Sequence, residues 1–159
     1  MSYPVSTVPD AIDYLLTAFQ TQLNTDANPE NILLYQGDDP GPNAPPDLVG
    51  IVDVVRNLEH FAMVGDGENL AMYEKYSVKV SISSAQRAAT EGAAATALSA
   101  RVWQLLAYLE YAVRLDPSLD SIVLTAWPGR ATGGLVQVAP SNTGWICELK
   151  WQVDCEATQ

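Results

Sequence analysis

The stretch WICELKWQVDCE, residues 145–156, alternates between apolar and polar side chains, with Ile146 as the exception. A period of two places successive side chains on opposite faces of a β-strand. The stretch therefore predicts a strand with one buried face and one solvated face. Residues 75–82, KYSVKVSI, show the same alternation and predict a second half-buried strand.

Two helices are predicted to pack on these strands. In 91–115, apolar side chains recur at helical spacing and fall within about 100° of one another around the helix axis. They are Leu98, Val102, Leu105, Leu106, Leu109 and Val113. A first helix over about 8–24 follows from the same spacing, and Thr7 with Asp10 forms a candidate capping pair at its start.

The remaining apolar runs predict further strands. The full set of expected strands covers 31–35, 48–58, 75–82, 121–127, 134–139 and 145–156. The order of elements is then α-β-β-β-α-β-β-β, and a chain of 159 residues has the length of one domain. We therefore expect a single α+β domain over 1–159, with a mostly antiparallel mixed sheet packed by two helices.

Residues 37–50, GDDPGPNAPPDLVG, separate the first two expected strands. Four of the ten prolines lie between 40 and 46, and Asp38, Asp39 and Asp47 add negative charge. Proline fixes φ and lacks a backbone donor, so a helix or a central strand is excluded here. The stretch predicts a long acidic loop, and loops of this length are usually functional or disordered.

The net charge of −11 is concentrated in the first part of the chain. Residues 1–68 hold eleven acidic side chains and one basic side chain, which gives −10. Such a surface repels nucleic acid and anionic lipid, so we expect neither as a direct partner. No apolar run reaches the roughly 20 residues that cross a bilayer, and the first residues lack a signal-peptide pattern. We expect a soluble protein made inside the cell.

The residues that carry common catalytic or metal chemistry are sparse. Cys147 and Cys155 are eight residues apart in one expected strand, which is about 26 Å at strand rise. This distance is too long for a disulfide between them within that strand. We expect both to be free buried thiols in a reducing compartment. His60 is the only imidazole, so a Cys/His zinc site lacks ligands. No nucleophile motif such as G-x-S-x-G supports a catalytic triad built on His60. Residues 129–134 lack the Lys and Ser/Thr of a phosphate loop, and 65–69 lack EF-hand spacing. We expect no catalytic, cofactor or metal site.

The second helix carries a candidate interaction surface. Its core stripe leaves Trp103, Ala107, Tyr111 and Arg114 on the opposite side. Large aromatic side chains on the outer side of a helix are typical of anchors at protein interfaces. Trp103 either contacts a neighbouring subunit or lies under an intrachain loop such as 37–50.

The order of elements, together with several short runs, resembles one protein family. The runs are VPDAIDYL at 8–15, ILLYQG at 32–37 followed by the Pro-rich acidic loop and DLVG at 47–50, the strand at 76–83 leading to 87–115 and LDPSL at 115–119, and the last strand at 145–156. Nearly the whole chain is similar in this way to the tail terminator proteins (tail-completion or head–tail joining proteins) of long-tailed bacteriophages with non-contractile tails. Asp120 and Ser121 depart from the pattern, because such sequences often carry glycines there.

The resemblance implies a structural virion protein at the tail–head junction. It implies a homo-oligomeric, hexameric ring that caps the tail tube, ends its polymerisation and binds the head connector or neck protein. It implies no enzyme activity and no cofactor. For Asp38, Asp39 and Asp47, two locations are open: the wall of the ring opening, where they would repel passing DNA, or a solvated outer loop. The alternative functions are another neck or head-completion protein of the same virion, or a small ligand-binding or hydrolytic domain.

Overall fold

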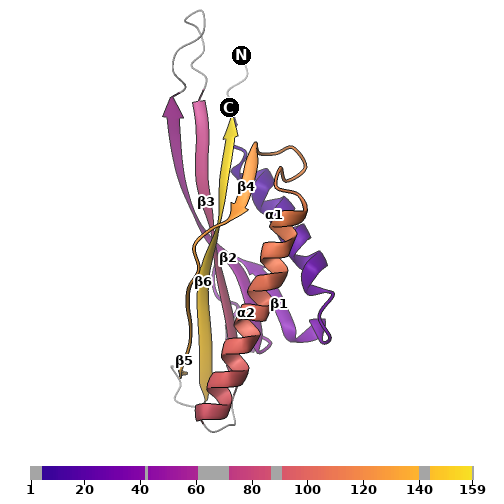
Figure 1. The fold of residues 1–159 in the computed structure, drawn as a ribbon, viewed down its shortest axis with the longest axis vertical. Coiled ribbons are helices and arrows are strands. Elements are labelled where there is room, and N and C mark those ends of the chain that lie inside the picture. The colour runs from indigo at the N-terminus through magenta and orange to yellow at the C-terminus, as the bar shows by residue number, and fades with distance from the viewer. Residues whose placement is uncertain (1–4, 42, 61–71, 87–90, 140–143, 159) are drawn as a thin grey trace, which may run out of the picture.

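The computed structural model describes residues 5–41, 43–60, 72–86, 91–139 and 144–158, whose arrangement Figure 1 shows. The elements are α1 (Val8–Leu23), the short 3-10 helix η1 (Pro29–Asn31), β1 (Ile32–Gln36), β2 (Asp47–His60), β3 (Met72–Gln86), α2 (Glu91–Leu115), β4 (Thr125–Pro128), β5 (Thr132–Val138) and β6 (Trp145–Thr158). Among the described residues, two α-helices and six strands of one mixed sheet confirm the predicted α+β class and the predicted order of helices and strands.

The sheet has the strand order β1-β2-β3-β6-β4, and β5 also pairs with β6. The β1–β2 pair is parallel, and every other pair is antiparallel. β4 pairs with 153–156 of β6, whereas β5 pairs with 145–150. The two short strands therefore lie one after the other along the same edge of β6. In the lower part of Figure 1, β1 lies at the opposite margin of the sheet from β5.

The hydrophobic core lies between the two helices and one face of the sheet. β3 and β6 contribute alternate side chains, as their period of two predicts, and α1 contributes Ala11, Leu15, Phe19 and Leu23. The rings of Phe19 and Trp151 are 6.1 Å apart between centroids, which joins α1 to β6. Cys147 and Cys155 are free and buried in this core, and burial raises the pKa of the Cys155 thiol to about 12. The other face of the sheet, which we call the open face, carries the polar side chains of β3 and β6.

The strand predicted over 121–127 is shorter than expected and begins at Thr125. The reason is a left-handed turn formed by three residues with positive φ: Leu119 (49°), Asp120 (57°) and Ser121 (66°). Asp116 stabilises the turn, because its Oδ2 accepts the backbone N–H of Asp120 at 2.7 Å. Glycine adopts positive φ without steric cost, which explains why it suits positions 120 and 121.

The start of α1 also differs from the prediction. Thr7 is the N-cap residue, but its hydroxyl makes no capping bond to the helix, so the Thr7–Asp10 capping pair is wrong. The backbone N–H and the hydroxyl of Thr7 instead donate to Oε2 of Glu74 at 3.0 and 2.9 Å. Glu74 is fully buried on β3 and also accepts from Ser6 and Arg56. A strand carboxylate thus satisfies donors at the helix start that a local cap would otherwise satisfy.

Candidate interaction surfaces

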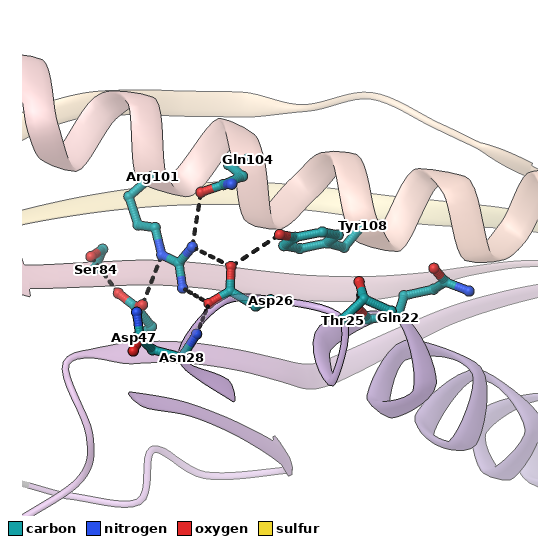
Figure 2. A network of polar contacts seen from close by, with 9 residues as sticks. All are labelled: Gln22, Thr25, Asp26, Asn28, Asp47, Ser84, Arg101, Gln104 and Tyr108. Atoms are coloured by element: carbon teal, nitrogen blue, oxygen red, sulfur yellow. Dashed lines mark hydrogen bonds and ion pairs between the residues drawn. The ribbon is translucent and has the colours of Figure 1, made fainter. Parts of the chain in front are cut away.

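A buried ionic cluster ties α2 to the start of β2 and to the segment that follows α1 (Figure 2). Arg101 donates from Nε to Asp47 at 2.9 Å, and from Nη1 and Nη2 to the two carboxylate oxygens of Asp26 at 2.8 and 3.0 Å. Tyr108 adds a 3.0 Å bond to Asp26, and Ser84 of β3 donates to Asp47 at 2.5 Å. One guanidinium therefore holds together three segments that are far apart in the sequence.

The cluster depends on the charged forms of its members. Hydrogen bonds from Arg101 outweigh the opposing effect of burial and hold the pKa of Asp26 well below its usual range. The same bonds raise the pKa of Arg101. Both carboxylates are almost fully buried, so the loss of the guanidinium would leave two uncompensated negative charges next to the core.

The three aspartates expected at a ring opening do not form one surface. Asp38 and Asp39 are exposed, and Asp39 accepts the backbone N–H of Gly41 at 2.7 Å. Asp47 is instead the first residue of β2, buried and paired with Arg101. Its inclusion among the acidic surface residues is wrong, because the loop ends one residue before it. The location of Asp38 and Asp39 in an assembly stays a prediction.

The four residues predicted on the outer side of α2 are all exposed. The exposed fractions are 46% for Trp103 and 54% for Tyr111, and Ala107 and Arg114 are also in contact with solvent. Arg114 makes a 3.6 Å ion pair with Glu110, one turn away. Whether a neighbouring subunit covers this side of α2 stays a prediction.

The intrachain contact that the structure shows for Trp103 is with β5. Its indole lies on Gly134 of β5, where an added Cβ would come within 2.7 Å of the indole Nε1. Gly134 has φ of +82° and belongs to a bulge in β5, and Ser99 of α2 donates to its carbonyl oxygen at 3.0 Å. A side chain at position 134 would therefore push the indole away from the strand.

Both margins of the sheet leave strand edges without a partner among the described strands. β5 pairs only with β6, and the exposed fraction of its Leu135 is 77%. β1 pairs only with β2. β4 is partly protected, because the backbone N–H of Ala126 donates to the carbonyl oxygen of Pro117 at 2.6 Å. Unpaired edges of this kind can pair with another chain.

The open face of the sheet has a hollow with a volume of about 750 Å³. Charged side chains of both signs line it, among them Lys79, Arg130, Lys150, Asp38 and Asp39. Lys79 donates to Gln152, whereas no ion pair between described residues involves Arg130 or Lys150. This face carries both signs of charge, so it is not a uniformly acidic wall.

A second hollow, of about 470 Å³, lies between α1 and the end of β1. Leu16 and Gln20 of α1 form one side of it, and Leu34 and Gln36 of β1 form the other. It lies beside the free edge of β1, on the side of the sheet that the helices cover. Sequence reasoning missed this hollow, because it depends on the angle at which α1 crosses the strand.

The described residues contain no group of three or more His, Cys, Asp or Glu side chains that could hold a metal ion. The side chain of His60 lies outside the described part of the structure. No helix in the described ranges is long and apolar enough to cross a membrane.

Comparison with known proteins finds a distant likeness in structure and none in sequence. No family model matches the sequence, and no curated protein matches it. Among solved structures, the fold is similar to a chain from the virion of a native gene transfer agent particle, at 11% sequence identity and a TM-score of 0.41. The match covers 94% of this chain and 98% of that chain.

Proposed function

We propose that this protein is a structural virion protein that forms a ring on the phage tail tube, ends tube polymerisation and joins the tail to the head connector. The sequence runs that resemble tail terminators support this function, and the observed element order agrees with them. The structural observation that carries it is the presence of free strand edges at opposite margins of one subunit, β1 at one margin and β5 at the other.

Because the free edges at the two margins, β1 and β5, are different, they favour a head-to-tail contact between copies. In such a contact, one margin of each copy meets the other margin of the next, and a suitable rotation closes the chain of copies into a ring. A contact between two identical margins would instead end at a dimer. The exposed Trp103 beside β5 adds an apolar anchor of the kind that dominates binding energy at interfaces.

The partners of such a ring are the tail tube protein on one side and the head connector or neck protein on the other. Asp38 and Asp39 stay candidates for the wall of its opening, because they are exposed and line the hollow of the open face. Arg130 and Lys150 on the same face offset part of their charge, so we expect this wall to repel DNA less strongly than three aspartates would.

The experiment is assembly followed by a capping assay. Light scattering coupled to size exclusion, from micromolar to near-millimolar concentration, measures the mass, and negative-stain images show whether rings are present. Purified protein is then added to polymerising tail tubes, where a terminator stops elongation at substoichiometric amounts. A strictly monomeric protein, or rings that leave tube length unchanged, would contradict the proposal. Rings that bind heads and not tails would favour the alternative, another neck protein.

A further inference from the structure

The free edges of β1 and β5 occupy the same position along the strand direction of the sheet, which we call the same height. The two strands run in opposite directions. The strand pairings connect them across the sheet, through Tyr35, Gly50, Ser81, Lys150 and Thr132 in one row. A lower row runs through Ile32, Asp47, Ser84, Cys147 and Val136. Three antiparallel pairings separate β5 from β2, and β1 is parallel to β2, so β1 and β5 are antiparallel to each other. A neighbour placed side by side would therefore present β1 to β5 in an antiparallel orientation.

The apolar features beside the two edges also match in position. Trp103 lies on Gly134, whose neighbour Gly133 belongs to the same row of the sheet as Leu34. Leu34 lines the hollow between α1 and β1. The indole and the hollow are thus at the same height and on the same, helix-covered side of the sheet. An exposed indole on one margin corresponds to a hollow of about 470 Å³ on the other.

The charges at the ends of the two strands are complementary. Arg130 precedes β5, and Asp38 and Asp39 follow β1. In an antiparallel pair, the start of one strand meets the end of the other, so the guanidinium would face the two carboxylates. All three residues line the hollow of the open face, and the nearby Tyr35 and Thr132 belong to one row of the sheet. No ion pair between described residues involves any of them.

We infer that β5 of one copy pairs with β1 of the next, that Trp103 fills the hollow between α1 and β1 of that neighbour, and that Arg130 faces its Asp38 and Asp39. The occupant of each margin is a second copy of this chain, because strand direction, height, shape and charge agree between the two margins. The inference rests on the proposed function only in requiring that the protein assembles with itself.

Cysteine cross-linking tests the strand pairing directly. Leu33 and Leu135 belong to one row of the sheet, so Leu33→Cys on one copy should meet Leu135→Cys on the next. Mixing the two single variants under mild oxidation should give disulfide-linked dimers, and the double variant should give a ladder of larger species. The native thiols are buried and contribute little background. Gln137 lies on the same face, two residues further along β5. If the register between the two copies is shifted by two residues, Gln137→Cys should form the disulfide with Leu33→Cys instead.

Two controls fix the orientation. Each single variant alone should stay monomeric on a non-reducing gel, because a head-to-tail contact never brings two copies of the same residue together. Val55→Cys lies on β2 beyond the part that β1 covers, so mixing it with Leu135→Cys should give no dimer. Strong cross-linking of Leu135→Cys with itself would overturn the inference in favour of a symmetric dimer.

A charge exchange tests the second contact. Arg130→Glu should raise the concentration needed for assembly about tenfold, since like charges then face each other across the interface. Adding Asp38→Lys and Asp39→Lys to the same chain should restore assembly. Rings that form without any of these effects would overturn this interface and leave the proposed function in place. Cross-linked rings that fail to stop tube growth would support the interface and contradict the function, and a protein that never assembles would contradict both.

Discussion

The two sides of α2 differ sharply in how they are bonded. On one side, Arg101 and Tyr108 are bonded to carboxylates from two other segments of the chain, and those carboxylates are buried (Figure 2). On the other side, Trp103 lies on Gly134 and about half of its surface stays in contact with water. The first side holds the subunit together, and the second leaves exposed aromatic surface that a partner can cover. Substitutions on the two sides should therefore affect different measurements.

The largest effect is expected from Arg101→Ala. It leaves Asp26 and Asp47 buried without a counter-charge, which should lower the free energy of unfolding by about 3 kcal/mol, at the low end for broken buried pairs because the arginine is partly exposed. Urea unfolding of the monomer measures the loss. Arg101→Lys keeps the charge but cannot form the forked bonds, so it should lose less. A stability equal to wild type in both variants would show that the cluster is not an anchor.

The next effect concerns the other side of the helix. Trp103→Ala should weaken assembly by about 2 kcal/mol, or roughly 30-fold in concentration, as expected for a central aromatic anchor. The monomer should lose less, because about half of the indole is exposed in the isolated subunit. Sedimentation over a concentration series measures assembly, and thermal unfolding at a concentration where the wild type is monomeric measures the fold.

The matched control is Leu106→Ala, a buried residue of the same helix, which should destabilise the monomer strongly. If Trp103→Ala behaves like Leu106→Ala, the indole belongs to the core of the subunit. The distinction between the two sides of α2 would then be wrong.

Acid should weaken the contacts of two buried carboxylates, Asp26 beside α2 and Glu74 at the start of α1. The folded-state pKa of Asp26 is lowered by bonds from Arg101. Burial favours a higher pKa for Glu74, but bonds from Ser6, Thr7 and Arg56 outweigh it and lower its pKa as well. A depressed folded pKa contributes stability above the unfolded value, about 4. That contribution is lost as the pH falls below it. Denaturant unfolding from pH 6 to pH 2.5 should show a falling free energy of unfolding, and Asp26→Asn should give a shallower fall.

The smallest effect is expected at the turn that follows α2. Ser121→Gly should raise the free energy of unfolding by about 0.5–1 kcal/mol, since glycine tolerates the φ of 66° better than serine. Ser121→Ala keeps the unfavourable φ and should bring no such gain. Assembly should be unchanged in both variants. A destabilised glycine variant would mean that the serine side chain contributes to the turn.

The sequence could predict those elements whose side-chain period is set by burial on one face. β3, β6 and both helices follow directly from their apolar spacing, as does the outer position of Trp103 and Tyr111. The burial of Glu74 could have been predicted but was missed. Glu74 lies two residues before Tyr76 and four before Val78, so the alternation places it on the same buried face. The end of the Pro-rich loop was placed too late, since proline and aspartate composition does not show where pairing with β1 and β3 begins.

The sequence by itself determined the α+β class, the order of elements and the half-buried character of the central strands, because periodicity is local and burial acts on each strand and helix in turn. Tertiary structure alone decided that Asp26, Asp47 and Arg101 meet, that Glu74 receives the donors at the start of α1, and that Trp103 lies on Gly134. These contacts join residues separated by 31 to 75 positions. Their positions depend on how the helices cross the sheet, which no local pattern encodes.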